Sequence, residues 1–204
     1  ILNLLKGKQM LANELKKMLE DGALEGYRSI YSDVKAQTER LIKAIDCFTE
    51  RFGEDRDISI FSVPGRSEIS GNHTDHNHGC VVAASIDLDI IAVASAREDS
   101  VIRIKSEGFP EDVVDFSVYN APVKEKFGSS QSIIAGMCAG FLKDGYKIGG
   151  FDAYTTSNVL KGSGLSSSAA FEVLIGVILS HLYNEGKVSA VEIAQIAQYT
   201  ENVY

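Results

Sequence analysis

The sequence predicts an α+β protein built around one mixed sheet. Three observations support this class. The first fifty residues have helical periodicity, the residues from Ile58 to about 119 alternate in the way of strands, and two further helical patterns flank one more strand. The pattern is not a regular series of strand, helix and strand, so a purely parallel sheet is not expected.

Two helical patterns open the chain. The first is LLKGKQMLANELKKMLEDG, and the second is SDVKAQTERLIKAIDCFTERFG, which ends at Gly53. The second pattern places apolar residues on one helical face, namely Val34, Leu41, Ile42, Ile45 and Phe48. We expect this face to cover a core.

The middle of the chain reads as strands and its last third as helices around one strand. ISIFSV begins the strand pattern, which continues in DIIAVASARED, SVIRIKSEG and DVVDFSV. SSQSIIAGMCAGFLKDG is helical, with Ile133, Ile134, Met137 and Phe141 on one face. The strand FDAYTTSNV then leads through a glycine loop into the long apolar helix LSSSAAFEVLIGVILSHLYNEG.

Composition limits the classes of partner. The 204 residues are 45% hydrophobic and 24% charged, which is typical of a folded globular protein. A net charge of −8 disfavours nucleic acid and anionic membrane surfaces as partners. The sequence has neither an apolar run of ~18 residues nor a signal-peptide pattern, so we expect no membrane association and a cytoplasmic location.

The cysteines and the chain ends suggest two further expectations. Cys47, Cys80 and Cys138 are odd in number and far apart, which favours reduced thiols over a disulfide or zinc framework. The chain begins at Ile1 and stops at Tyr204 within a helical pattern that has no cap. We therefore expect it to be a piece of a longer protein.

The polar stretch PGRSEISGNHTDHNHG, residues 64–79, is the first candidate site. It holds three of the four histidines between two apolar strand patterns, and the residues alone fit a metal site, a sugar site or a well-capped turn. His73, His76 and His78 with Asp75 would supply enough ligands for zinc. A glycine-flanked loop without cysteine is nevertheless a poor tetrahedral cage, so we disfavour the zinc interpretation.

The second candidate site is GSGLSSSAA, residues 162–170. A glycine loop before a helix brings backbone N–H groups and the positive helix end toward an anion. Three hydroxyls in the first turn can cap the helix, bind phosphate or ligate magnesium. The stretch lacks the GK[ST] ending of a P-loop, and Ser167 stands where a dinucleotide fingerprint requires glycine.

Together the two stretches resemble the galactokinase family of the GHMP kinase superfamily. The first resembles the signature that begins Pro-Gly-Arg and runs to Gly-x-His-Thr-Asp, and the second resembles the family's nucleotide loop. YTENVY at the end resembles a family segment, Ala-Glu-Asn. The resemblance covers about Leu41 to Tyr204.

The resemblance implies a fold and a division of the chain. Residues 37–204 would form the ATP- and sugar-binding N-terminal domain of a GHMP kinase, a ribosomal-protein-like mixed sheet with helices packed on one face. The family's C-terminal domain would be absent from this chain. Residues 1–36 would be a helical extension that the family does not explain.

The resemblance also implies a reaction and the residues that perform it. A galactokinase-type enzyme transfers the γ-phosphate of ATP to the anomeric hydroxyl of galactose, with Mg²⁺ as cofactor, and its partners are the sugar and ATP. The family's catalytic aspartate is expected beyond Tyr204. The matching residues here would be Arg66 as catalytic and sugar-binding residue, Asn72, His73 and Asp75 for the sugar, Gly162, Gly164, Ser166 and Ser167 for the nucleotide, and Ser168 and Glu201 for magnesium.

Departures from the family pattern leave alternatives open. Glu68 and Asn72 stand where the family usually has asparagine and glutamate, so the preferred sugar is open. A kinase for N-acetylgalactosamine, arabinose or a non-sugar alcohol is one alternative, and a sensor that binds sugar and ATP without turnover is another. The intact SSSAA run favours catalysis over the sensor. The sequence leaves the oligomeric state undetermined.

Overall fold

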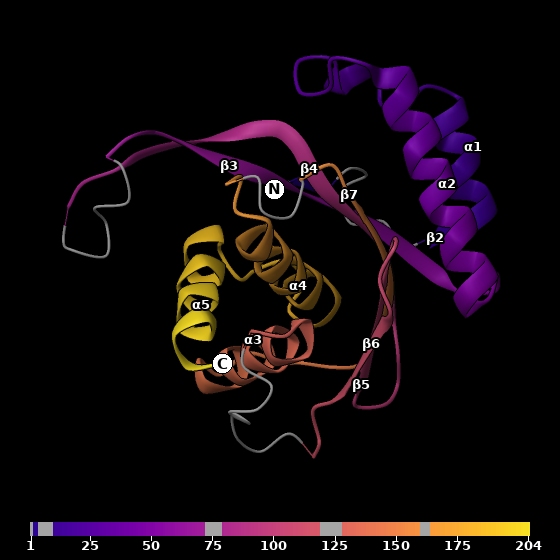
Figure 1. The fold of residues 1–204 in the computed structure, drawn as a ribbon. Helices are drawn as coiled ribbons and strands as arrows, with labels where there is room; N and C mark the ends of the chain where they lie inside the picture. The colour runs from indigo at the N-terminus through magenta and orange to yellow at the C-terminus, as the bar shows by residue number, and fades with distance from the viewer. Residues whose placement is uncertain (1, 4–9, 72–78, 119–127, 160–163) are drawn as a thin grey trace.

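The chain folds as a mixed sheet that carries helices on both of its faces (Figure 1). The computed structural model describes residues 2–3, 10–71, 79–118, 128–159 and 164–204. The strands are β1 Leu2–Asn3, β2 Met10–Leu11, β3 Asp57–Ser70, β4 Val82–Ala96, β5 Val101–Ser106, β6 Glu111–Asp115 and β7 Phe151–Ser157. The helices are α1 Ala12–Glu20, the 3-10 turn η1 Glu25–Tyr27, α2 Val34–Phe52, α3 Ser130–Lys143, α4 Ser167–Tyr183 and α5 Ala190–Val203.

The sheet is mixed, as the sequence predicts. Its strand order is β1-β3-β4-β7-β5-β6, and β2 pairs with β3 as well. Each pairing between the described strands is antiparallel except that of β5 with β7, which is parallel and begins with Ile102 opposite Phe151. The α+β class predicted from the sequence is confirmed.

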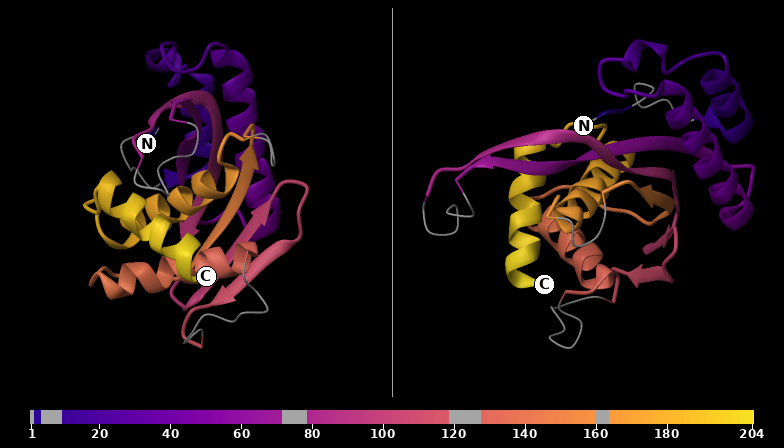
Figure 2. Two further views of the ribbon diagram at one scale, coloured as in Figure 1. Left: turned by 60° about the vertical axis from the view of Figure 1, so that its left-hand side comes forward. Right: turned by 45° about the horizontal axis from the view of Figure 1, so that its top comes forward.

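Three helices cover one face of the sheet, also as predicted. α3, α4 and α5 enclose a core with the inward side chains of β3, β4 and β7, among them Phe61 and Phe151. Figure 2 shows these helices together on one side of the strands. At Gly176 of α4, an added Cβ would lie 2.6 Å from Cγ2 of Ile193 on α5, so the helices approach closely there.

The N-terminal helices cover the opposite face. Leu41, Ile45 and Phe48 of α2 are buried in a second core that also contains Leu15 and Leu19 of α1. The apolar stripe predicted on α2 therefore does bury, but on the face opposite α3–α5 (Figure 1). The division into 1–36 and 37–204 remains a prediction, and its boundary falls in the first turn of α2.

β3 and β4 are longer than the sequence pattern suggests. The polar stretch that begins at Pro64 stays paired as strand to Ser70, and its partner strand starts again at Val82. Proline has no N–H to donate, and the ladder shifts register between Pro64 and Arg66. The paired ends project beyond the other strands (Figure 1). Arg66 lies within β3, on a strand rather than in a loop.

Several smaller expectations can also be compared with the structure. The first predicted helix is shorter than its pattern, because Met10–Leu11 pairs with β3 and α1 begins at Ala12. Cys47, Cys80 and Cys138 are free thiols. Of the described helices, none combines the length and apolar character that a bilayer crossing requires.

Candidate active site

The two sequence motifs meet at one point of the structure. The backbone N–H of Arg66 on β3 donates to the carbonyl oxygen of Leu165 over 3.1 Å. Nε of Arg66 also donates to Oγ of Ser166 over 3.2 Å. We call Arg66, Leu165 and Ser166 the site junction. It joins the predicted sugar signature to the predicted nucleotide loop across a separation of 100 residues.

Gly65 lets the strand and the loop approach this closely. A Cβ at Gly65 would lie 3.1 Å from the carbonyl oxygen of Leu165 and equally close to side-chain atoms of Val159 and Ile86. The glycine of the Pro-Gly-Arg motif is thus required by packing, independently of any ligand. A larger residue would push Arg66 away from the loop.

The serine before α4 does not cap its helix, unlike the serines before α3 and α5. Ser129 caps α3 and Ser189 caps α5, each by accepting a hydrogen bond from a backbone N–H of the first turn. Ser166 precedes α4 in the left-handed region, with φ 58° and ψ 51°, and makes no side-chain capping bond. Its hydroxyl accepts a bond from Arg66 instead. Ordinary capping therefore does not account for this serine.

The loop before α4 has space beside its backbone. Gly164 has φ +76°, a conformation that favours glycine, and an added Cβ would meet no atom of the described residues within 4 Å. Ser167 begins α4 and Ser168 follows it with an exposed side chain. A helix N-terminus with open N–H groups and hydroxyls in its first turn suits phosphate oxygens.

Glu172 is a buried acid of this region that the sequence analysis missed. It is 1% exposed, and Oε1 has no hydrogen-bond partner within the described part of the chain. Burial, and then the nearby charge of Glu201 on α5, raise the pKa of Glu172 to about 7. The signal in the sequence was a single acid inside the apolar run AAFEVLIGVIL.

Glu172 is related to each of the two predicted magnesium ligands, Ser168 and Glu201. Ser168 lies four residues before Glu172 on α4, so the two share a helix face. The charge of Glu201 on α5 also acts on Glu172. In the described ranges no three His, Cys, Asp or Glu side chains form a metal-binding group. A cation here would need ligands from phosphate or water as well.

Glu68 is the second acidic neighbour of the site. Its Oε2 lies 3.9 Å from Nη1 of Arg66, whose side chain is 45% exposed. Both residues belong to β3, two positions apart, and therefore project from the same face of the strand. The guanidinium of Arg66 thus lies between a hydroxyl of the nucleotide loop and a carboxylate of its own strand.

Several predicted site residues lie outside the described residues. These are Asn72, His73, Asp75 and Gly162, together with the zinc alternative that includes His76 and His78. The structure brings Arg66 and Ser166 into contact, places Ser167 and Ser168 in the same turn, and puts Glu201 on α5.

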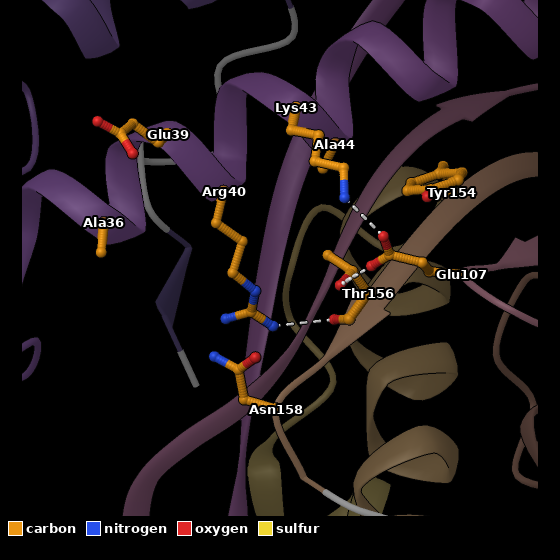
Figure 3. Close-up of a pocket in the computed structure, with 9 residues that line it drawn as sticks. All are labelled: Ala36, Glu39, Arg40, Lys43, Ala44, Glu107, Tyr154, Thr156 and Asn158. Atoms are coloured by element: carbon orange, nitrogen blue, oxygen red, sulfur yellow. Dashed lines mark hydrogen bonds and ion pairs between the residues drawn. The ribbon is translucent and has the colours of Figure 1, made fainter.

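A hollow of about 370 Å³ lies elsewhere, under α2 on the opposite sheet face (Figure 3). Its charged side chains are largely satisfied by each other. Lys43 pairs with Glu107 over 2.8 Å, Thr156 donates to Glu107 over 2.6 Å, and Arg40 donates to the carbonyl oxygen of Thr156 over 3.0 Å. These contacts fix α2 to the sheet and leave the site junction as the candidate active site.

Comparison with known proteins identifies the class first. The family described as "GHMP kinases N terminal domain" matches residues 129–204. The fold is shared with the mevalonate kinase of Methanococcus jannaschii, at a TM-score of 0.58 and 18% identity over 70% of this chain and 45% of that one. Over residues 129–204 the chain is similar to the N-terminal domain of GHMP kinases.

A more specific match follows from the polar strand. The family described as "Galactokinase galactose-binding signature" matches residues 46–96. A galactokinase of Lactococcus lactis subsp. lactis is 38% identical over 160 residues, and one of Clostridium beijerinckii is 36% identical over 159. The crystal structure of Lactococcus lactis galactokinase complexed with galactose superposes with a TM-score of 0.71 at 33% identity, over 79% of this chain and 42% of that one.

These findings make the chain similar to galactokinases over about three quarters of its length. It spans about two fifths of the length of the curated relatives it matches: 77% of this chain aligns with 39% of the first relative and 40% of the second.

Proposed function

We propose that this chain contributes the ATP- and sugar-binding part of a galactokinase-type sugar 1-kinase, which transfers the γ-phosphate of ATP to the anomeric hydroxyl of galactose. The observation that carries the proposal is the site junction. It brings the arginine of the sugar signature to Ser166, the residue directly before a helix whose N-terminus has no side-chain capping bond. A phosphoryl group delivered to that helix end would lie beside a guanidinium.

The reaction requires little covalent chemistry from these residues. The bond between the γ-phosphorus and the bridging oxygen of ADP breaks, and a bond from the sugar oxygen to phosphorus forms. The proton of the sugar hydroxyl leaves to a general base, which the family resemblance assigns to an aspartate beyond Tyr204. Arg66 would stabilise the charge on the transferred group, and Gly164, Ser166 and Ser167 would hold phosphate oxygens. Gly162 is assigned to the same loop by resemblance.

Magnesium fits the same proposal. Ser168 and Glu201 would hold the ion, and its charge would neutralise the phosphates when it is bound. The fit rests on Glu172, a buried acid with an unpartnered oxygen close enough to Glu201 for the two charges to interact. Two acids near each other without a cation are costly, and a bound cation would relieve that cost.

Galactose is the proposed acceptor, bound through Arg66, Asn72, His73 and Asp75. The support is the galactose-binding signature over residues 46–96 and the match to a galactokinase crystallised with galactose. The Glu68 and Asn72 exchange keeps a related acceptor, such as N-acetylgalactosamine or arabinose, as the second candidate. A cytoplasmic location is part of the proposal.

Sugar-dependent consumption of ATP by the full-length protein tests the proposal. We expect ADP release with galactose and formation of a sugar 1-phosphate, both of which require magnesium. A panel of galactose, N-acetylgalactosamine and arabinose separates the two enzyme candidates. Binding of sugar and ATP without ADP release in any arm would favour the sensor and contradict the proposal.

A further inference from the structure

The guanidinium of Arg66 has two partners from different elements. Ser166, from the nucleotide loop, receives a hydrogen bond from Nε over 3.2 Å, and Glu68, from the same strand, lies 3.9 Å from Nη1. We propose that Ser166 is a positioning residue for Arg66, holding the guanidinium toward the nucleotide loop and away from Glu68. The inference rests on the proposed function, in which Arg66 meets the transferred phosphoryl group.

Glu68 competes with the loop for the arginine. It stands two residues from Arg66 on the same strand face, in a part of the ladder whose register is continuous from Arg66 to Glu68. A carboxylate attracts a guanidinium more strongly than a hydroxyl does. Without the hydroxyl of Ser166, Arg66 would turn to Glu68, and part of its charge would be neutralised before any phosphate arrived.

Ser166 is suited to hold the arginine because its backbone is fixed. Its left-handed conformation directs the side chain away from the capping position. The bond from the Arg66 N–H to the Leu165 carbonyl, and the close approach at Gly65, hold strand and loop together. The hydroxyl is therefore preorganised for the arginine.

This arrangement couples the two ligands. The position of Arg66 depends on the conformation at Leu165 and Ser166, and a nucleotide bound to the loop would bias that conformation. An Arg66 held beside the loop, with its charge kept away from Glu68, would then raise the affinity for sugar, and the reverse effect must have the same size. Ser166 would act through Arg66, not through the phosphates alone.

A double-mutant cycle on the full-length protein tests the inference by steady-state kinetics. Ser166→Ala should lower kcat about tenfold, the size expected for loss of one charge-assisted hydrogen bond. In a Glu68→Gln background, the same change should lower kcat by about threefold or less, because the competing charge is gone. If Ser166 only binds phosphate, the nucleotide KM rises with kcat unchanged and Glu68→Gln gives no recovery. That result would overturn the inference.

Ser167→Ala is the matched control. Ser167 belongs to the same turn and the same predicted phosphate site, but within the described residues it makes no hydrogen bond to Arg66. We expect Glu68→Gln to leave the effect of Ser167→Ala unchanged. If Glu68→Gln restored kcat equally in Ser166→Ala and Ser167→Ala, a specific role for Ser166 would be contradicted.

A binding measurement separates this inference from the proposed function. Calorimetry gives the galactose Kd with and without a non-hydrolysable ATP analogue. We expect the analogue to tighten sugar binding in the wild type and to have less than half that effect, as a fold-change, in Ser166→Ala. If the wild type is active and the analogue tightens galactose binding equally in Ser166→Ala, only this inference fails. Wild type that consumes no ATP with any sugar would defeat the proposed function, and this inference with it.

Discussion

A buried acid lies near each end of the sheet, and the two acids differ in whether they have partners of opposite charge. At the end that begins β7, Asp152 is fully buried and accepts hydrogen bonds from three arginines, Arg56, Arg97 and Arg103. We call these four residues the Asp152 cluster. At the other end, near the start of α4, Glu172 is equally buried, but one of its oxygens has no hydrogen-bond partner among the described residues, and a second acid is nearby.

The pKa values of the two acids express the difference. Burial alone would raise the pKa of Asp152, but hydrogen bonds from Arg103, Arg56 and Arg97 outweigh burial and hold the pKa below its ordinary value. The pKa of Glu172 is raised to about 7 by its burial and by the nearby charge of Glu201. One end of the sheet is built for stability, whereas the other keeps a cost that a ligand can relieve.

The Asp152 cluster should give the largest loss of stability. Asp152→Asn removes the charge that three arginines share, leaving them partly buried without it, and we expect a loss of about 3–5 kcal/mol in the free energy of unfolding. Urea unfolding followed by circular dichroism measures the loss. An unchanged urea midpoint would show that the Asp152 cluster does not stabilise the fold.

Neutralising Glu172 should have the opposite effect at high pH and raise the free energy of unfolding. The folded state holds its proton more tightly than the unfolded chain, so its stabilising contribution is complete below the ordinary pKa of about 4.5 and is lost as the pH rises through about 7. Glu172→Gln mimics the neutral acid and should be more stable than the wild type above pH 7, by up to about 3 kcal/mol.

The comparison is made by unfolding both proteins from pH 4 to pH 9 with a chelator present. The two curves should converge near pH 4. Parallel curves across this range would mean that Glu172 titrates normally, and the proposed contrast with Asp152 would fail. Added magnesium should reduce the difference if a cation binds beside Glu201.

A smaller effect is expected at Gly164, and it should concern binding rather than stability. Valine at this position would have to adopt a positive φ and would fill the open space beside the loop. Gly164→Val should weaken ATP binding about tenfold or more, measured by calorimetry, while the variant stays folded. Unchanged ATP affinity in a folded variant would mean that the loop holds no phosphate.

The sequence predicted one end of the sheet far better than the other. Arg66 and Ser166 fall within short motifs whose spacing reflects a local backbone, and the structure brings these two residues into contact. The Asp152 cluster joins residues from four separate segments, so no local pattern could predict it. Its members look like ordinary surface charges in the sequence.

The remaining differences also come from long-range packing. The sequence marked an apolar stripe on α2 but could not tell which sheet face would receive it. The polar residues after Pro64 looked like a loop because their composition is polar, whereas strand pairing with β4 extends β3 to Ser70. Propensity and polarity are local, and pairing partners override both.

Phosphoryl transfer by two arginine variants tests the central claim most directly. Arg66→Ala removes the arginine of the site junction, and Arg103→Ala removes one from the Asp152 cluster, at the opposite end of the sheet. With ATP and galactose, the full-length Arg66→Ala variant should lose about 3–4 kcal/mol of transition-state stabilisation, a fall in kcat of about 10²–10³-fold, with ATP affinity retained. Arg103→Ala should retain kcat per folded molecule while unfolding at lower urea. Near-normal turnover by a folded Arg66→Ala protein would contradict the assignment of this site.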